Sequence, residues 1–164
     1  MKFRERQKIA ATAFETDEAG RLIEKFDEAN PETLPPLVLA YVGDAVFHLY
    51  VRRRLLSYVQ SPVDVVSQFG AKIVSAVCQS HAYEKIEPML TEEETAIFRR
   101  GRNAHSRTPH SATVREYHIS TGFEALLGML YLKSETGRLR EILEAAFRTI
   151  AEEIANSVET KKIG

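Results

Sequence analysis

The sequence has almost none of the residues that build disulfides and cysteine-based metal sites. Its 164 residues include one cysteine, Cys78, and no tryptophan. One cysteine excludes an internal disulfide and a cysteine-based zinc site, and it agrees with a reducing compartment. We expect Cys78 to be a small buried apolar side chain.

Long uncharged apolar runs are also missing. The two longest apolar stretches contain Asp44 and Glu124 near their middle, and both fall short of the ~18 uncharged residues that a membrane-spanning helix needs. The first residues carry charges of both signs without a following apolar segment, which argues against a secretory signal. We therefore expect a soluble, cytoplasmic protein that does not act at a membrane.

An excess of charge of one sign is absent as well. The formal net charge is −1 and the isoelectric point is near 6.5. This balance provides no overall attraction to polyanions, so a nucleic-acid surface would require a local concentration of arginine. The length and the 44% apolar content are typical of one domain with a single core.

Helix signals recur along the chain, whereas sustained apolar and polar alternation does not, so the sequence predicts an all-α protein. Ser61 is the predicted N-cap of a helix that starts at Pro62, and residues 91–94 fit a capping box. Residues 101–120 lack an apolar period and are predicted to form a loop, with Gly101 just past a helix end. The predicted helices are residues 36–56, 62–84 with a break at Gly70, 92–100, 121–133 and 138–156.

We interpret residues 1–33 as an N-terminal extension that is amphipathic or partly mobile, residues 34–157 as the main domain and residues 158–164 as a tail. The extension is rich in mixed charge. The only buried stripe it can offer is Ile9, Ala13, Leu22, Ile23 and Phe26.

Two predicted core helices carry one carboxylate each, Asp44 in the first and Glu124 in the second. A buried carboxylate is costly unless it is paired, hydrogen-bonded or bound to a metal. Gly43, Gly122 and Gly128 lower helix propensity, and they indicate a close approach of helices that would let the two acids face each other. The more frequent role of a single buried acid is pairing with an arginine or capping a helix, and the spacing alone leaves that alternative open.

If the two acids do meet, they form an oxygen-rich site of the kind that Mg²⁺ prefers. Such a site suits phosphodiester hydrolysis. His48 lies one helical turn beyond Asp44, but we expect it to be a packed or surface histidine.

Four segments of the sequence resemble known motifs. Residues 39–46 (LAYVGDAV) resemble the signature of the RNase III family, and residues 121–128 (TGFEALLG) resemble the second acidic motif of that family. Residues 90–94 (LTEEE) and 99–104 (RRGRNA) resemble segments of its Mini-III subfamily. The resemblance covers residues 37–143, and its four motifs occur in the family's order.

The resemblance implies a single helical RNase III endonuclease domain, with Asp44 and Glu124 as catalytic residues and Mg²⁺ ligands. It further implies a homodimer, cleavage of double-stranded RNA and maturation of large-subunit (23S) ribosomal RNA, with a ribosomal protein as a possible helper. Leu37 and Ala40 stand at the two Glu positions of the RNase III signature and Thr121 at the Asp position of the second motif, so Asp44 and Glu124 are the catalytic acids that remain. The chain is also too short after the motifs for the double-stranded-RNA-binding domain that usually follows, so the nuclease domain itself is expected to bind the substrate.

A basic segment supplies the expected RNA-binding surface. Residues 96–115 contain five arginines and no acidic residue. Loop arginine, asparagine and serine donors suit the phosphates and 2′-hydroxyls of A-form RNA. The alternative for any one of these arginines is solvation of the loop or pairing with the acidic residues 92–94. The predicted RNA-binding residues are Arg99, Arg100, Arg102, Asn103, Ser106 and Arg107.

Two other functions compete with an active nuclease. The first is a catalytically silent RNase III-like protein that binds RNA or the ribosome, although such proteins typically lose one of the two core acids and this chain keeps both. The second is another helical metal phosphohydrolase, but those usually carry a His-Asp dipeptide and the sequence has none.

Overall fold

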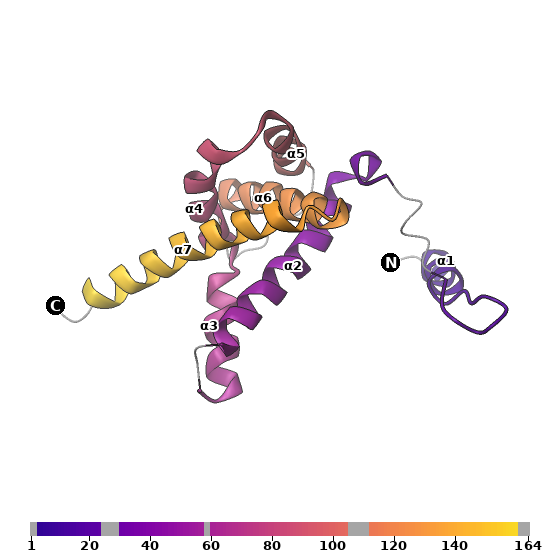
Figure 1. Ribbon diagram of the computed structural model, residues 1–164, viewed down its shortest axis with the longest axis horizontal. Helices are drawn as coiled ribbons and strands as arrows, with labels where there is room; N and C mark the ends of the chain where they lie inside the picture. The colour runs from indigo at the N-terminus through magenta and orange to yellow at the C-terminus, as the bar shows by residue number, and fades with distance from the viewer. Residues whose placement is uncertain (1–2, 24–29, 58–59, 105–111, 161–164) are drawn as a thin grey trace. The chain divides into compact units, whose positions relative to one another are not determined.

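The computed structural model describes residues 3–23, 30–57, 60–104 and 112–160. Within these ranges the chain forms seven α-helices and no strand, which confirms the all-α prediction (Figure 1). None of these helices is long and apolar enough to span a membrane. The helices are α1 (Phe3–Ala13), α2 (Pro36–Leu56), α3 (Val63–Ile73), α4 (Ala76–Ile86), α5 (Glu92–Arg102), α6 (Val114–Leu132) and α7 (Thr136–Thr160), with 3-10 turns at Pro31–Thr33 and Glu87–Met89.

The chain divides into two compact units, Met1–Thr33 and Leu34–Gly164. The first contains α1 and an isolated bridge between Thr16 and Leu22. No described side chain of α1 is buried, and Leu22 and Ile23 are exposed. The described members of the one stripe that this segment can offer are thus not buried, and Phe26 lies outside the described residues.

Helix α2 begins and ends where the sequence predicts, since Pro36 occupies the first turn and suits it. The following helix differs from the prediction. It begins at Val63 with Pro62 in the N-cap position, and it stops at Ile73 rather than breaking at Gly70. Ser75 then caps α4 by accepting a hydrogen bond from the Cys78 amide at 3.4 Å, and the Cys78 side chain is only partly buried. The Ser75 cap therefore sets the boundary between α3 and α4, and Gly70 lies inside α3.

The predicted loop over residues 101–120 is helical at both of its ends. Helix α5 continues to Arg102, so Gly101 lies inside it, and α6 begins already at Val114. The cause is a second capping box, in which Thr113 accepts from the Glu116 amide and the Glu116 carboxylate accepts from the Thr113 amide. Residues 105–111 lie outside the described residues. The last helix, α7, also starts before the predicted residue 138 and runs past residue 156.

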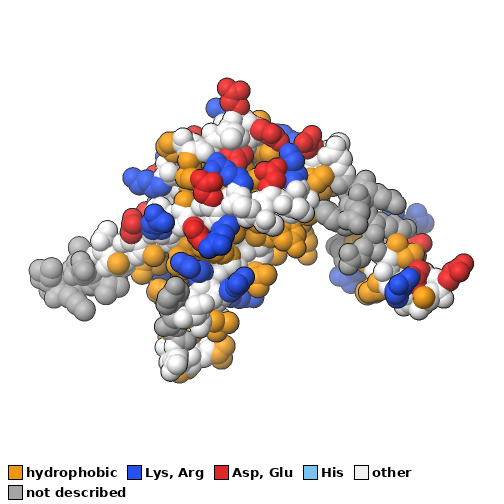
Figure 2. All heavy atoms as spheres, in the orientation of Figure 1, with side chains coloured by type: hydrophobic (Ala, Val, Ile, Leu, Met, Phe, Trp, Pro, Cys, Tyr) orange, Lys and Arg blue, Asp and Glu red, His pale blue; other side chains and the backbone are white. Residues whose placement is uncertain are grey.

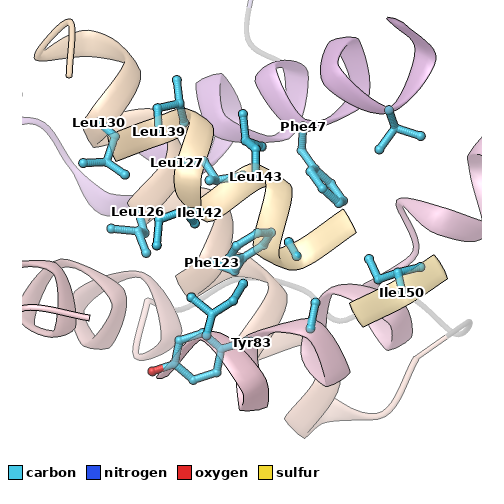
Figure 3. Close-up of a cluster of buried hydrophobic side chains, with 14 of the residues drawn as sticks. Phe47, Tyr83, Phe123, Leu126, Leu127, Leu130, Leu139, Ile142, Leu143 and Ile150 are labelled. Atoms are coloured by element: carbon cyan, nitrogen blue, oxygen red, sulfur yellow. The ribbon is translucent and has the colours of Figure 1, made fainter. Parts of the chain in front are cut away.

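The core lies where α2, α4, α6 and α7 meet, and Figure 3 shows their buried side chains converging there. Phe47 of α2 meets Phe123 of α6 edge to face, with ring centroids 5.6 Å apart. Tyr83 of α4 stacks on Phe98 of α5 at 3.7 Å. Helix α6 is buried from Ile119 to Leu130 except at Glu124, which lies in the middle of this buried stretch.

The N-terminus of α5 is fixed by an ion pair between Arg138 of α7 and Glu94. Arg138 Nε lies 2.7 Å from Glu94 Oε1, and the guanidinium also donates to the Met89 carbonyl at 2.6 Å. The hydrogen bonds from Arg138 hold the pKa of Glu94 below its ordinary value. This pair holds α5 in place, so the arginines at its other end have a defined position.

Candidate active site

Helices α2 and α6 cross in direct backbone contact at two glycines. A Cβ atom added to Gly43 would overlap the backbone of Glu124, and one added to Gly128 would overlap the Leu39 carbonyl. No side chain can give way there, because the neighbouring atoms belong to the backbone. The close approach predicted from these glycines is confirmed, and it places Asp44 and Glu124 on adjoining turns of two touching helices.

A second contact of this kind joins α5 to α6. A Cβ atom on Gly101 would lie 2.9 Å from the Cα atom of Gly122, and one on Gly122 would lie 2.6 Å from the ring of Phe98. Gly101 is therefore a packing residue of α5, and the sequence-based expectation that it ends the helix was wrong.

The two acids differ in their surroundings. The side chain of Asp44 is 50% exposed, whereas that of Glu124 is turned into the protein. Burial raises the pKa of Glu124 to about 8, the charge of Asp44 adds to the rise, and a hydrogen bond from Gln79 opposes it. The structure thus brings the two carboxyl groups close enough for one to act on the other electrostatically.

His48 stays near the surface, but it is not independent of the acids. Its Nε2 atom lies 3.3 Å from Oδ1 of Asp44, one turn earlier on α2, and its side chain is 34% exposed. The four-residue spacing of Asp44 and His48 predicts this contact, because side chains four residues apart are neighbours on a helix.

A third helix contributes a residue that the sequence analysis did not single out. Gln79 of α4 is 1% exposed, and its Nε2 atom donates to Oε1 of Glu124 at 3.1 Å and to the Val74 carbonyl at 2.9 Å. The available signal was its place in an apolar stripe, since the buried residues of α4 include Ala82, Tyr83 and Ile86 at helical spacing from it.

The donor set fits a hard divalent cation. It consists of two carboxylates, one of which raises the pKa of the other. The amide of Gln79 that donates to Glu124 lies next to them, with its oxygen buried and without a hydrogen-bond donor in the described part of the chain. A cation between the carboxylates would relieve the repulsion, and Mg²⁺ needs only one or two carboxylates because it retains several waters. No group of three or more His, Cys, Asp or Glu side chains arranged for a metal occurs in the described ranges, so a cage made only of such ligands is not formed.

The positions where RNase III has other acids add little to this set. Ala40 is buried and Leu37 is 40% exposed, and neither has an oxygen. Thr121 is buried, and its hydroxyl donates to the Tyr117 carbonyl at 2.9 Å. The centre therefore has two acids, as the sequence indicates.

The basic segment is only partly described. Arg99, Arg102 and Asn103 are exposed at the C-terminal end of α5, and Arg102 Nε donates to Oδ1 of Asn103 at 3.2 Å. Arg100 is also exposed, but its guanidinium donates to the Leu34 carbonyl at 3.1 Å. Ser106 and Arg107 lie outside the described residues. Arg99 and Arg102 are thus the described arginines of the set best placed to meet a ligand.

Comparison with known proteins identifies the family of this site. The family described as the ribonuclease III domain matches residues 37–135. A Mini-ribonuclease 3 of Symbiobacterium thermophilum is 47% identical over 119 residues, which are 72% of this chain and 92% of that protein. A Mini-ribonuclease 3 of Thermoanaerobacter is 45% identical over 121 residues, which are 73% of this chain and 85% of that protein.

A solved structure agrees with these sequences. A crystal structure of a Fusobacterium nucleatum protein superposes with a TM-score of 0.65 at 30% identity, over 71% of this chain and 93% of that one. Both acidic motifs lie inside the segment that the family matches. The chain therefore belongs to the ribonuclease III family and, within it, to the Mini-ribonuclease 3 group.

Proposed function

We propose that this protein is a Mg²⁺-dependent endoribonuclease that cleaves double-stranded RNA, with Asp44 and Glu124 as catalytic residues and metal ligands. One observation carries the proposal. The two acids of the family motifs lie on helices in backbone contact, and burial, with the charge of Asp44 adding to it, raises the pKa of Glu124. Two such groups are stable as neighbouring anions only when a cation joins them.

The residues have separate tasks in this proposal. Asp44 and Glu124 hold the cation, which supplies positive charge to the scissile phosphate and lowers the pKa of water. Asp44 is the solvent-facing acid, so it is the one that a phosphodiester approaches. Glu124 is set deeper by the packing of α6, and Gln79 restrains its carboxylate. His48 lies against Asp44 and restrains its rotamer.

Metal dependence is the first test. The purified protein should cut a perfectly paired RNA duplex in Mg²⁺ and leave it intact in the same buffer with excess EDTA. Cleavage that continues in EDTA would contradict the metal assignment. Tight duplex binding without cleavage in either buffer would instead favour a catalytically silent RNA-binding protein.

We infer that the RNA backbone is gripped by the exposed end of α5. Replacement of Arg99 or Arg102 by alanine should weaken duplex binding about equally for different sequences, because phosphate contacts do not read bases. Each change should also reduce the slope of log affinity against log salt by somewhat under one unit. Affinity measured by fluorescence anisotropy at several salt concentrations gives both quantities.

Arg140→Ala is the matched control for these variants. It removes the same charge from an exposed side chain on α7, where Arg140 pairs with Glu144 at 2.9 Å. We expect its affinity and salt slope to stay at the wild-type values. If both remain unchanged also in a protein lacking Arg99, Arg100, Arg102 and Arg107, the α5 end is ordinary solvated surface.

We propose further that the protein is a homodimer. Apolar side chains are exposed over the C-terminal half of α2 and over α3, which we call the α2–α3 arm, and Figure 2 shows them at the surface. They include Leu49, Leu56, Val63, Val65 and Phe69. An apolar area of this extent on a charged surface is typical of a protein interface, and a second copy satisfies it with the same residues.

Light scattering at micromolar concentration should give the mass of a dimer. Val63 is 83% exposed, so Val63→Glu should fold normally and yield monomers. A monomeric wild-type protein would contradict the dimer, and a dimeric Val63→Glu variant would move the interface away from the arm.

The natural substrate proposed for this activity is the precursor of large-subunit (23S) ribosomal RNA in the cytoplasm, with a ribosomal protein as a possible helper. This proposal follows from the resemblance to the Mini-III subfamily, and the relatives named Mini-ribonuclease 3 support membership in that group. Primer extension on ribosomal RNA from cells that lack the protein should show unprocessed ends, and mature ends would contradict the assignment.

A further inference from the structure

Gln79 is polar, buried and hydrogen-bonded to Glu124, one of the two proposed catalytic acids. Helix α4 starts at Ala76 behind its Ser75 cap, and this start puts residue 79 on the face that packs against α6. With 1% of its surface exposed, the Gln79 amide is removed from bulk water. Such a group is costly to bury unless each of its polar atoms finds a partner.

The two hydrogens of the amide are both used. Nε2 donates to Val74 O at 2.9 Å and to Glu124 Oε1 at 3.1 Å. The opposite orientation of the amide would point its oxygen at two acceptors, so the hydrogen bonds themselves determine which atom is the nitrogen. The link to the Val74 carbonyl ties the side chain to the backbone just before α4.

The amide oxygen of Gln79, Oε1, can only accept a hydrogen bond. Oε1 is buried and receives no hydrogen bond from any residue in the described ranges. When the site holds a cation, Glu124 is ionised, so its carboxylate only accepts hydrogen bonds and cannot donate to this oxygen. In that state the partner of Oε1 is a donor or a cation outside the described residues.

We propose that Gln79 is a positioning residue of the metal centre, which fixes Glu124 through its N–H group and accepts through Oε1 a hydrogen bond from the hydration shell of the bound cation. This inference rests on the proposed function. It gives the two-acid centre a third oxygen, contributed by a helix that carries neither acidic motif. Groups that orient ligands and ligand waters typically change metal affinity 10–100-fold when removed.

Two substitutions separate this role from a structural one. Gln79→Met keeps the length and bulk of the side chain but removes both amide functions. Gln79→Glu keeps an oxygen at each branch, loses the N–H donor and adds a charge that attracts a cation. Ile142→Val, a truncation in the buried part of α7, controls for loss of stability alone.

Mn²⁺ binding to the RNA-free protein, followed by electron paramagnetic resonance, is the primary readout. We expect Gln79→Met to raise the Mn²⁺ dissociation constant about tenfold or more. Gln79→Glu should bind Mn²⁺ at least as tightly as wild type. Both variants should lower kcat for duplex RNA about tenfold while KM changes less than twofold, and Ile142→Val should alter neither Mn²⁺ affinity nor kcat.

Wild-type Mn²⁺ affinity in Gln79→Met would overturn the proposal, as would a weakening of Mn²⁺ binding in Gln79→Glu. If Gln79→Met does not fold, the isosteric Gln79→Glu variant decides the question alone. If wild type binds Mn²⁺ but does not cut RNA, the proposed function fails, while the Mn²⁺ series still tests Gln79.

Discussion

Glu124→Gln should abolish duplex cleavage while leaving the fold intact. The amide has the shape of the acid but cannot hold a cation as an anion does, so we expect kcat to fall about a thousandfold, or ~4 kcal/mol of transition-state stabilisation. Because the pKa of Glu124 is raised to about 8, the metal-free protein at neutral pH carries this group mainly as a neutral acid. A neutral amide therefore fits the site, and circular dichroism should show an unchanged fold.

Asp44→Asn is expected to give the same loss of kcat, because both acids hold the proposed cation. Glu152→Gln is the matched control, since Glu152 is exposed on α7 and the change again exchanges a carboxylate for an amide. Its kcat should stay within twofold of wild type. Full Mg²⁺-dependent cleavage by either active-site variant would remove that residue from the catalytic centre.

Gly43→Ala should destabilise the protein and disrupt the site at once. The added methyl group would overlap the Glu124 backbone, so α2 and α6 must separate. We expect the free energy of unfolding to fall by about 3 kcal/mol, and the midpoint of thermal unfolding by about 10 °C. Cleavage by the remaining folded protein should also fall, because Asp44 and Glu124 are held on the two displaced helices.

Gly70→Ala tests whether this effect belongs to the helix contact rather than to glycine in a helix. Gly70 is also buried, but a methyl group there meets only Leu55 Cδ1 at 3.5 Å, an ordinary contact. Alanine favours a helix by about 1 kcal/mol over glycine, so this variant should be as stable as wild type or slightly more stable. A Gly43→Ala variant with wild-type stability and kcat would show that the α2 and α6 backbones are not in contact.

Local signals in the sequence account for much of the fold. Helix α2 has the predicted bounds because Pro36 marks its start, and α5 starts at the predicted capping box of Thr91 and Glu94. The same signal at Thr113 and Glu116 was missed, because the surrounding residues have the composition of a loop. The sequence predicts a break at Gly70 and a helix end at Gly101, but both lie inside helices. A side chain fits at Gly70, whereas the close approach of α6 requires glycine at position 101.

The candidate site was only partly visible in the sequence. Asp44 and Glu124 stand out because each is the single charge in an apolar segment, residues 37–47 and 122–132. Gln79 does not, because its importance comes from two contacts, one to Glu124 and one to Val74, that exist only after α4 packs against α6. The effect of Asp44 on the pKa of Glu124 likewise depends on a separation in space that no spacing in sequence defines.

The measurement that tests the central claim most directly is the initial rate of cleavage of one RNA sequence in Mg²⁺, supplied either as a perfect duplex or as its separated strands. Asp44→Asn provides the background rate for both substrates. We predict rapid cleavage of the duplex by the wild-type protein, slow or no cleavage of the single strands, and only background with Asp44→Asn. Equal cleavage of both forms, or cleavage of the duplex by Asp44→Asn at the wild-type rate, would contradict a double-strand-specific ribonuclease centred on Asp44 and Glu124.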